Sequence, residues 1–147
     1  MVRHWPHIAV NDVSASSAWY GTLLGCTSPH RQDHPHRKLF DQIADADGTV
    51  LLSFVSRAGH ELPWIPEGGP FGSGLELYFL VEDFDAAWQR ARTLAAEVER
   101  EPHVEPQGYQ TRSITVRDPD GYCVGIADGK QGWFATLRPE WRPPSRA

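Results

Sequence analysis

RDPDGYCVGIAD, residues 117–128, is the stretch of sequence that decides the fold. It follows the run RSITVR at 112–117, in which apolar and polar side chains alternate as they do in a half-buried strand. The segment DPDG at 118–121 supplies turn chemistry, because proline fixes φ, aspartates accept from the nearby backbone and glycine permits positive φ. Residues 122–127 return as a second strand, so the stretch predicts a β-hairpin.

A weaker copy of this pattern lies in the first half of the chain. DADG at 45–48 precedes the apolar run TVLLSFV at 49–55, and Asp45 lies 73 residues before Asp118. VNDVSA at 10–15 matches VEDFDA at 81–86 with an offset of 71 residues. Because both offsets are close to half of the 147 residues, the sequence predicts an internal duplication.

Each half is expected to contain a strand, a helix that an aspartate caps, and further strands. In the first half, Asp12 or Ser14 is expected to begin a helix that runs to Leu24 and that Gly25 ends. In the second half, Asp83 is expected to begin a helix that extends to about Glu101. The expected strands before the hairpin are 6–10, 39–44, 49–55 and 75–81.

The duplicated pattern predicts an α+β fold with two βαβββ modules in one chain. Neither module could bury its sheet alone, so the modules are expected to pack together or across a dimer. The prediction is a single domain, residues 1–147, with the following parts: module one at about 4–56, a connection at 57–74, module two at 75–128 and a C-terminal tail at 129–147. The proline- and arginine-rich part of the tail, 133–147, is expected to lie over the surface.

Composition excludes several classes of function. The 40% hydrophobic and 22% charged content is typical of a soluble globular protein. A net charge of −5 gives no support to nucleic acid or an anionic membrane as partner. No apolar run approaches the ~18 residues of a membrane span, and the N-terminus has no secretory h-region. Cys26 and Cys123 show no metal or redox spacing, which favours a cytoplasmic location.

The chain resembles the vicinal oxygen chelate superfamily, which includes glyoxalase I, extradiol dioxygenases, fosfomycin-modifying enzymes and bleomycin-resistance proteins. The resemblance covers roughly residues 5–128. It is carried by PHIAVNDVSASSAWYGTLLGC at 6–26, LYFLVEDFDAAW at 77–88 and RDPDGYCVGIAD at 117–128. It implies that the curved mixed sheets of the two modules form a cup, with the helices on the outer faces, the active site inside and usually a homodimer around it.

The resemblance also implies where metal-dependent members bind a divalent ion. One position on the first strand of each module lies seven residues before the capping aspartate, and one on the last strand lies four residues after the turn glycine. In this chain these positions hold Trp5, Leu52, Glu76 and Gly125. Only Glu76 offers a donor, and a divalent site needs several, so no metal cofactor is expected. The alternative is Fe, Mn, Ni or Zn bound by Glu76 with His4 or His7.

Alternation along residues 75–81 places Glu76 and Tyr78 on the face that lines the cup, because the other set is wholly apolar. Cys123 lies on the same wall, and Gly125 is expected to leave room there. The candidate ligand-binding residues are Trp5, His7, Glu76, Tyr78, Trp64, Ser113, Thr115 and Gly125. Three plainer interpretations remain open: Glu76 as a solvated strand residue, His7 as a structural histidine, and the His-rich loop 30–36 as only a polar loop.

These residues predict a metal-free binding protein of the bleomycin-resistance kind, which sequesters a small aromatic or cationic natural product. The first alternative is a divalent-metal-dependent lyase, transferase or dioxygenase with a displaced ligand set. The second is a metal-free isomerase or cyclase in which Glu76 and His7 act as an acid–base pair. In each case the expected partners are a small organic ligand and a second copy of the chain.

Overall fold

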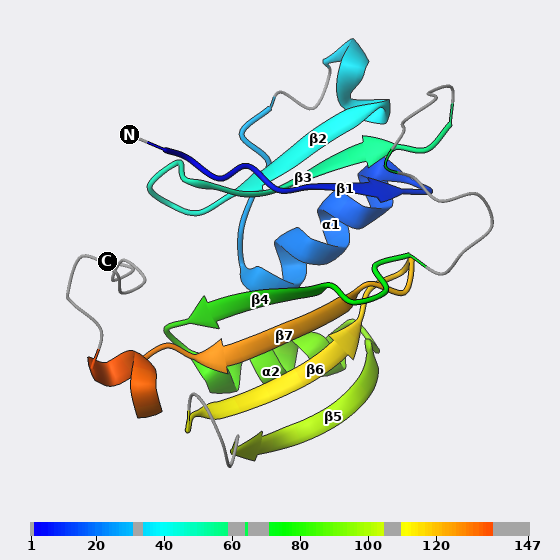
Figure 1. Ribbon diagram of the computed structural model, residues 1–147. Coiled ribbons are helices and arrows are strands. Elements are labelled where there is room, and N and C mark those ends of the chain that lie inside the picture. The colour runs from blue at the N-terminus through cyan, green and yellow to red at the C-terminus, as the bar shows by residue number, and fades with distance from the viewer. Residues whose placement is uncertain (1, 31–33, 59–63, 65–70, 105–109, 137–147) are drawn as a thin grey trace. The chain divides into compact units, whose positions relative to one another are not determined.

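The structure is a computed structural model that describes residues 2–30, 34–58, 64, 71–104 and 110–136. These residues form two α-helices and seven strands in two mixed sheets, which confirms the predicted α+β fold with two modules (Figure 1). The chain divides into two compact units, residues 1–71 and 72–147. We call them module one and module two. None of the helices in the described part of the chain is long and apolar enough to cross a membrane.

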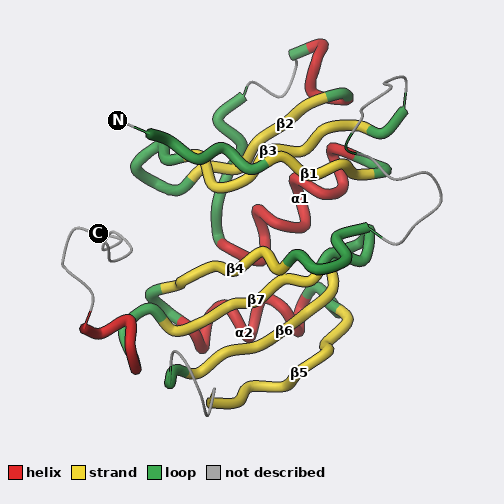
Figure 2. The backbone as a smooth tube through the Cα atoms, in the orientation of Figure 1, coloured by secondary structure: helices red, strands yellow, loops and turns green. Residues whose placement is uncertain are grey.

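Module one contains a three-stranded sheet in the order β1-β3-β2, with helix α1 against one face (Figure 2). Strand β1 is parallel to β3, and β2 is antiparallel to it. Asp12 begins α1 by accepting a hydrogen bond from the Ala15 N–H at 2.9 Å, and Gly25 ends it at φ 66°, as the sequence predicts. The elements are β1 (His7–Val10), α1 (Val13–Leu24), the 3₁₀ helix η1 (Pro35–Lys38), β2 (Phe40–Ala44) and β3 (Val50–Ser56).

Module two contains a four-stranded sheet in the order β4-β7-β6-β5, with helix α2 behind it (Figures 1 and 2). Strands β4 and β7 are parallel, and the other pairs are antiparallel. The elements are β4 (Glu76–Val81), α2 (Phe84–Thr93), β5 (Glu97–Val104), β6 (Arg112–Arg117), β7 (Cys123–Asp128) and the 3₁₀ helix η2 (Gly132–Thr136).

The hairpin predicted at 112–128 forms as β6 and β7. Ile114 pairs with Ile126, Val116 pairs with Val124, and all four side chains are fully buried. The turn is closed by Asp118, whose Oδ1 accepts hydrogen bonds from the backbone N–H groups of Asp120 and Tyr122 at 2.9 and 2.8 Å. Asp118 is itself buried, so its carboxylate replaces water for these two donors.

The predicted extension of the second helix to Glu101 is wrong. Helix α2 ends at Thr93, Ala95 has a positive φ of 51°, and Glu97–Val104 forms strand β5, which pairs with β6. This segment, EVEREPHV, is an edge strand with mostly exposed, charged side chains and an irregular register. Because such a strand shows little apolar alternation, its sequence does not distinguish it from an exposed helix.

Module one lacks a regular counterpart of β5 among the described residues. At the corresponding place in the chain, a single antiparallel bridge joins Thr27 to Ala44. Pro29 and Pro35 lie in the segment that follows the bridge. Proline cannot donate to a strand ladder, which accounts for the shortness of this pairing.

We predict that Asp118→Ala lowers the free energy of unfolding by about 2 kcal/mol, because two backbone N–H groups at a buried turn lose their acceptor. Asp118→Asn keeps one side-chain oxygen and should cost less. Urea denaturation of the two variants and the wild type measures both losses. Equal losses for the two variants would contradict the proposed role of the Oδ1 acceptor.

Candidate functional site

Module two brings six of the predicted residues onto one face of its sheet. Arg112 on β6 contacts α2 through Asp85 at 3.1 Å, so Arg112, Ile114 and Val116 face the helix. Ser113 and Thr115, which alternate with these residues along β6, face the side opposite α2. The residues of β7 and β4 that pair with them across the sheet face the same side. These residues are Glu76 and Tyr78 on β4, Ser113 and Thr115 on β6, and Cys123 and Gly125 on β7.

The expected empty space at Gly125 is filled. A Cβ atom at this position would lie 2.6 Å from Tyr78 Cδ2 and 3.0 Å from Glu76 Oε1. Tyr78 pairs with Gly125 directly, and its ring lies over the bare backbone of β7. Gly125 therefore does not open a hole in the sheet face; it allows Tyr78 and Glu76 to approach the backbone closely.

Glu76 is exposed and pairs across the sheet with Cys123. The Cys123 thiol lies 3.9 Å from Glu76 Oε2 and donates to it. Burial raises the pKa of Cys123, and the negative charge of Glu76 raises it further. Cys123 is therefore a protonated thiol at neutral pH and contributes a weak donor rather than a nucleophile.

Two further observations define this face. Phe134 of η2 is buried and lies 6.3 Å from the Tyr78 ring, so the beginning of the predicted tail packs against the face. Ser113 is also buried, and among the described residues its hydroxyl has no hydrogen-bond partner. Trp133 is exposed, and residues 137–147, including Trp141, lie outside the described part of the chain.

Module one places His7 on the face opposite α1, within an aromatic and polar cluster. The Phe40 ring lies 6.0 Å from His7 and 6.0 Å from His30. His30 Nε2 lies 2.9 Å from Gln42 Oε1, and Gln42 Nε2 donates to Ser53 Oγ at 3.0 Å. Ser53 is also the residue of β3 that pairs with His7.

The sequence prediction missed Phe40, Gln42 and Ser53 and left His30 in a polar loop. The alternation FDQIA along residues 40–44 could have placed Phe40 and Gln42 on one face. The reach of His30 to Gln42 depends on a contact between loop and strand that sequence spacing does not encode.

Leu52 does not occupy the position that counting from the turn predicts. It is fully buried and pairs with Ile43, whereas Ser53 faces away from α1. The cause is an irregularity in the ladder, where Ile43 pairs with Leu52 but Ala44 pairs with Val50. The extra residue, Leu51, moves every later side chain of β3 to the other face.

The remaining predicted residues lie outside the strands of the two sheets. Trp5 and His4 precede β1, and both are exposed. Trp64 is exposed, and its neighbours at 59–63 and 65–70 lie outside the described residues. His34 and His36 flank the start of η1 with their rings 5.3 Å apart. Within the described ranges, no three His, Cys, Asp or Glu side chains group closely enough to hold a metal ion.

A family model described as Glyoxalase/Bleomycin resistance protein/Dioxygenase superfamily matches residues 3–126. The chain belongs to this superfamily. No curated protein matches the chain in sequence.

Several solved structures share the fold of this superfamily member at low sequence identity. TioX from Micromonospora sp. ML1 has a TM-score of 0.67 at 16% identity, covering 87% of this chain and 98% of that chain. A glyoxalase/bleomycin resistance protein/dioxygenase family enzyme from Burkholderia phytofirmans PsJN has a TM-score of 0.64 at 19% identity, covering 84% and 95%. A lactoylglutathione lyase from Agrobacterium tumefaciens has a TM-score of 0.59 at 20% identity, covering 88% and 94%.

The four positions implied for metal ligands in superfamily members do not fit a divalent ion here. With the β3 register corrected, they hold Trp5, Ser53, Glu76 and Gly125. The Glu76 carboxylate is the only strong metal ligand among these four side chains. The indole of Trp5 and the hydroxyl of Ser53 are poor ligands, and Gly125 has no side chain.

We predict that Gly125→Ala destabilises the protein by about 2 kcal/mol, because the new methyl group overlaps the Tyr78 ring. In a Tyr78→Ala background the same change should cost less, since the overlapping ring is gone. A double-mutant cycle in urea measures this coupling. Additive effects of the two changes would show that the ring does not lie over Gly125.

The loop that carries His30 is anchored by Asp41 on the α1 side of β2. Its Oδ1 accepts from Ser28 Oγ at 2.5 Å, and its Oδ2 accepts from Arg37 Nη2 at 2.9 Å. Burial favours a higher pKa for Asp41, but hydrogen bonds from Ser28, Ser17, Arg37 and the Gln42 N–H outweigh it, so the pKa lies below 3.8. The ionised carboxylate therefore stabilises the folded loop.

We predict that Asp41→Asn costs about 2 kcal/mol of stability at pH 7, because the charge-assisted bonds are lost. The folded-state pKa is depressed, so the contribution is complete above the ordinary pKa of 3.8 and disappears as the pH falls through the folded value. Unfolding of wild type and variant from pH 7 to pH 2 should show a difference that shrinks below about pH 4. A difference that grows in acid would contradict this assignment.

Proposed function

We propose that the chain binds a small aromatic or cationic molecule without a metal and sequesters it unchanged. The observation that carries the proposal is the pair formed by Glu76 and Tyr78 beside Gly125 on the face opposite α2. An exposed carboxylate next to an aromatic ring provides both charge and π-surface for a flat cation.

The cluster on module one supports the same kind of ligand. His7, Phe40 and His30 provide aromatic rings, and the buried side chains of Gln42 and Ser53 provide a small number of fixed polar groups. Ligand sites typically combine apolar and aromatic walls with a few such groups.

The acid–base alternative receives less support from the geometry. A carboxylate that serves as a general acid or base commonly lies in a site that is shielded from water. Glu76 is instead exposed, and so is His7. An exposed carboxylate suits electrostatic attraction of a ligand better than proton transfer.

Binding can be tested with ethidium as a planar cationic probe and fluorescein as an anionic one. We expect ethidium to quench tryptophan fluorescence and fluorescein to bind more weakly. Glu76→Gln should weaken ethidium binding roughly tenfold, because a charge-assisted contact is lost. The matched control is Glu97→Gln, an exposed glutamate on β5, which should leave the affinity unchanged. Equal effects of the two variants would refute the role of Glu76.

The enzyme alternatives are tested on the same complexes. Mass spectrometry of the probe after incubation should show it unaltered, with and without added Fe, Mn, Ni or Zn. A probe altered only with metal would favour the lyase, transferase or dioxygenase alternative. A probe altered without metal would favour the isomerase or cyclase that uses Glu76 and His7. Homodimer formation and a cytoplasmic location stay predictions, the first of which light scattering would check.

A further inference from the structure

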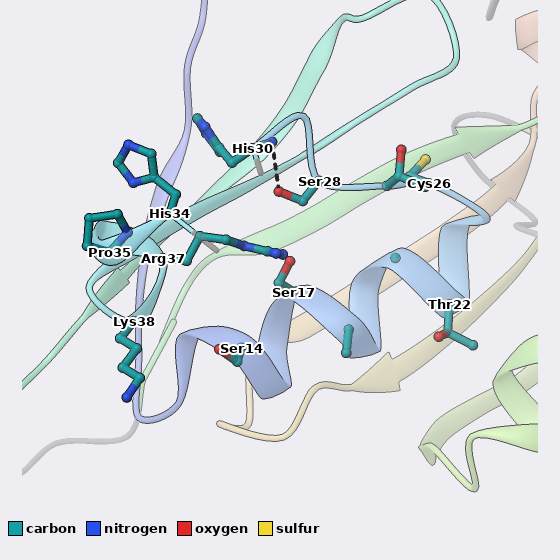
Figure 3. Close-up of a pocket in the computed structure, with 13 residues that line it drawn as sticks. Ser14, Ser17, Thr22, Cys26, Ser28, His30, His34, Pro35, Arg37 and Lys38 are labelled. Atoms are coloured by element: carbon teal, nitrogen blue, oxygen red, sulfur yellow. Dashed lines mark hydrogen bonds between the residues drawn. The ribbon is translucent and has the colours of Figure 1, made fainter. Parts of the chain in front are cut away.

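A pocket of about 780 Å³ lies beside α1 in module one (Figure 3). Its walls come from one side of α1, from the segment 26–30 and from η1. A pocket of this size can hold a small organic molecule, since ligand pockets are typically about 300–1,000 Å³. Of the residues assigned above to ligand binding, only His30 contributes to its lining.

The chemistry of the walls is basic and rich in hydroxyl groups. Arg37, Lys38, His30 and His34 line the pocket, and no Asp or Glu is among the described residues that do so. Ser and Thr side chains fill much of the remaining wall. The absence of acidic side chains from the described lining contrasts with the chain as a whole, in which Asp and Glu outnumber Lys and Arg by 19 to 14.

The buried carboxylate of Asp41 holds the guanidinium of Arg37 in place. Arg37 Nε and Nη2 donate to Asp41 Oδ2 at 3.3 and 2.9 Å, and the arginine side chain remains 22% exposed. A guanidinium has five N–H donors, so the two bonds to Asp41 leave three for another acceptor. Asp41 offsets the positive charge of Arg37, but it also fixes the orientation of the guanidinium N–H groups. Lys38 adds a second positive charge to the pocket, and Asp41 does not bind it.

The loop is also fixed on the side that faces the pocket. The His30 backbone N–H donates to Ser28 Oγ at 3.1 Å, the contact drawn in Figure 3. Ser28 in turn donates to Asp41. The guanidinium and the segment 28–30 are therefore ordered by the same buried carboxylate, which lowers the entropy cost of binding a ligand between them.

We propose that this pocket binds a small hydroxylated anion through its phosphate group. Planar guanidinium groups and ammonium groups are the common protein partners of phosphate. The serine and threonine hydroxyls match the hydroxyl groups of such a ligand. This inference goes beyond the proposed function, because it assigns a second ligand class to a pocket in module one, whereas Glu76 and Tyr78 lie in module two.

The test is an NMR titration of uniformly ¹⁵N-labelled full-length protein at constant ionic strength. Inorganic phosphate and glycerol 3-phosphate should shift the backbone amides of Ser28, His30 and Arg37 in a saturable manner. Glycerol 3-phosphate should bind more tightly, because it also offers hydroxyl groups. Lys38→Ala should weaken binding roughly threefold to tenfold, the loss typical of one charged contact.

Two comparisons keep the result specific. Lys130→Ala removes another exposed lysine, in module two, and should leave the affinity unchanged. Arg37→Lys keeps the charge beside Asp41 but loses the planar fork, so it should weaken binding while the protein stays folded. Shifts that chloride reproduces at equal ionic strength, or an affinity that Lys38→Ala leaves intact, would overturn the proposal. Neither outcome depends on ethidium binding at Glu76.

Discussion

The side chains that a ligand can reach in this fold are set by the two-residue period of the strands. Each sheet buries one face against its helix, so the register of every strand decides which residues lie on the opposite face. The irregularity at Leu51 shows how strict this constraint is. One extra residue in β3 buries Leu52 against α1 and brings Ser53 next to His7. The hydroxyl that anchors Gln42 on this face follows from that single insertion.

The two modules use equivalent positions in different ways. Ser53 pairs with His7 in module one as Gly125 pairs with Tyr78 in module two. In module one, the buried hydroxyl belongs to a hydrogen-bonded chain that includes Gln42 and His30. In module two, the missing side chain lets an aromatic ring lie on the backbone. The duplication therefore preserves the strand pairing, while the chemistry of the two faces has diverged.

Local chemistry explains what the sequence predicts well. The caps at Asp12, Gly25 and Asp83 and the 118–121 turn are satisfied by residues within a few positions, and each forms where expected. The features that the sequence did not predict depend on contacts between residues that are distant in sequence. Strand β5 is a strand because β6 offers it a ladder, not because of its own pattern. In the same way, the bulge in β3 and the bond from His30 to Gln42 need the folded sheet.

Membership of the superfamily fixes the scaffold and leaves the reaction open, because one fold hosts many chemistries. Individual side chains must therefore distinguish binding from catalysis. Cys123 stays protonated beside Glu76, which removes a nucleophile from the face opposite α2. Glu76 remains in water, whereas a carboxylate that serves as a general acid or base commonly lies in a shielded site. This face therefore offers the ring of Tyr78, the accessible negative charge of Glu76 and the weak thiol donor of Cys123. These groups are suited to the recognition of a ligand, and they are the basis on which we propose binding rather than acid–base catalysis.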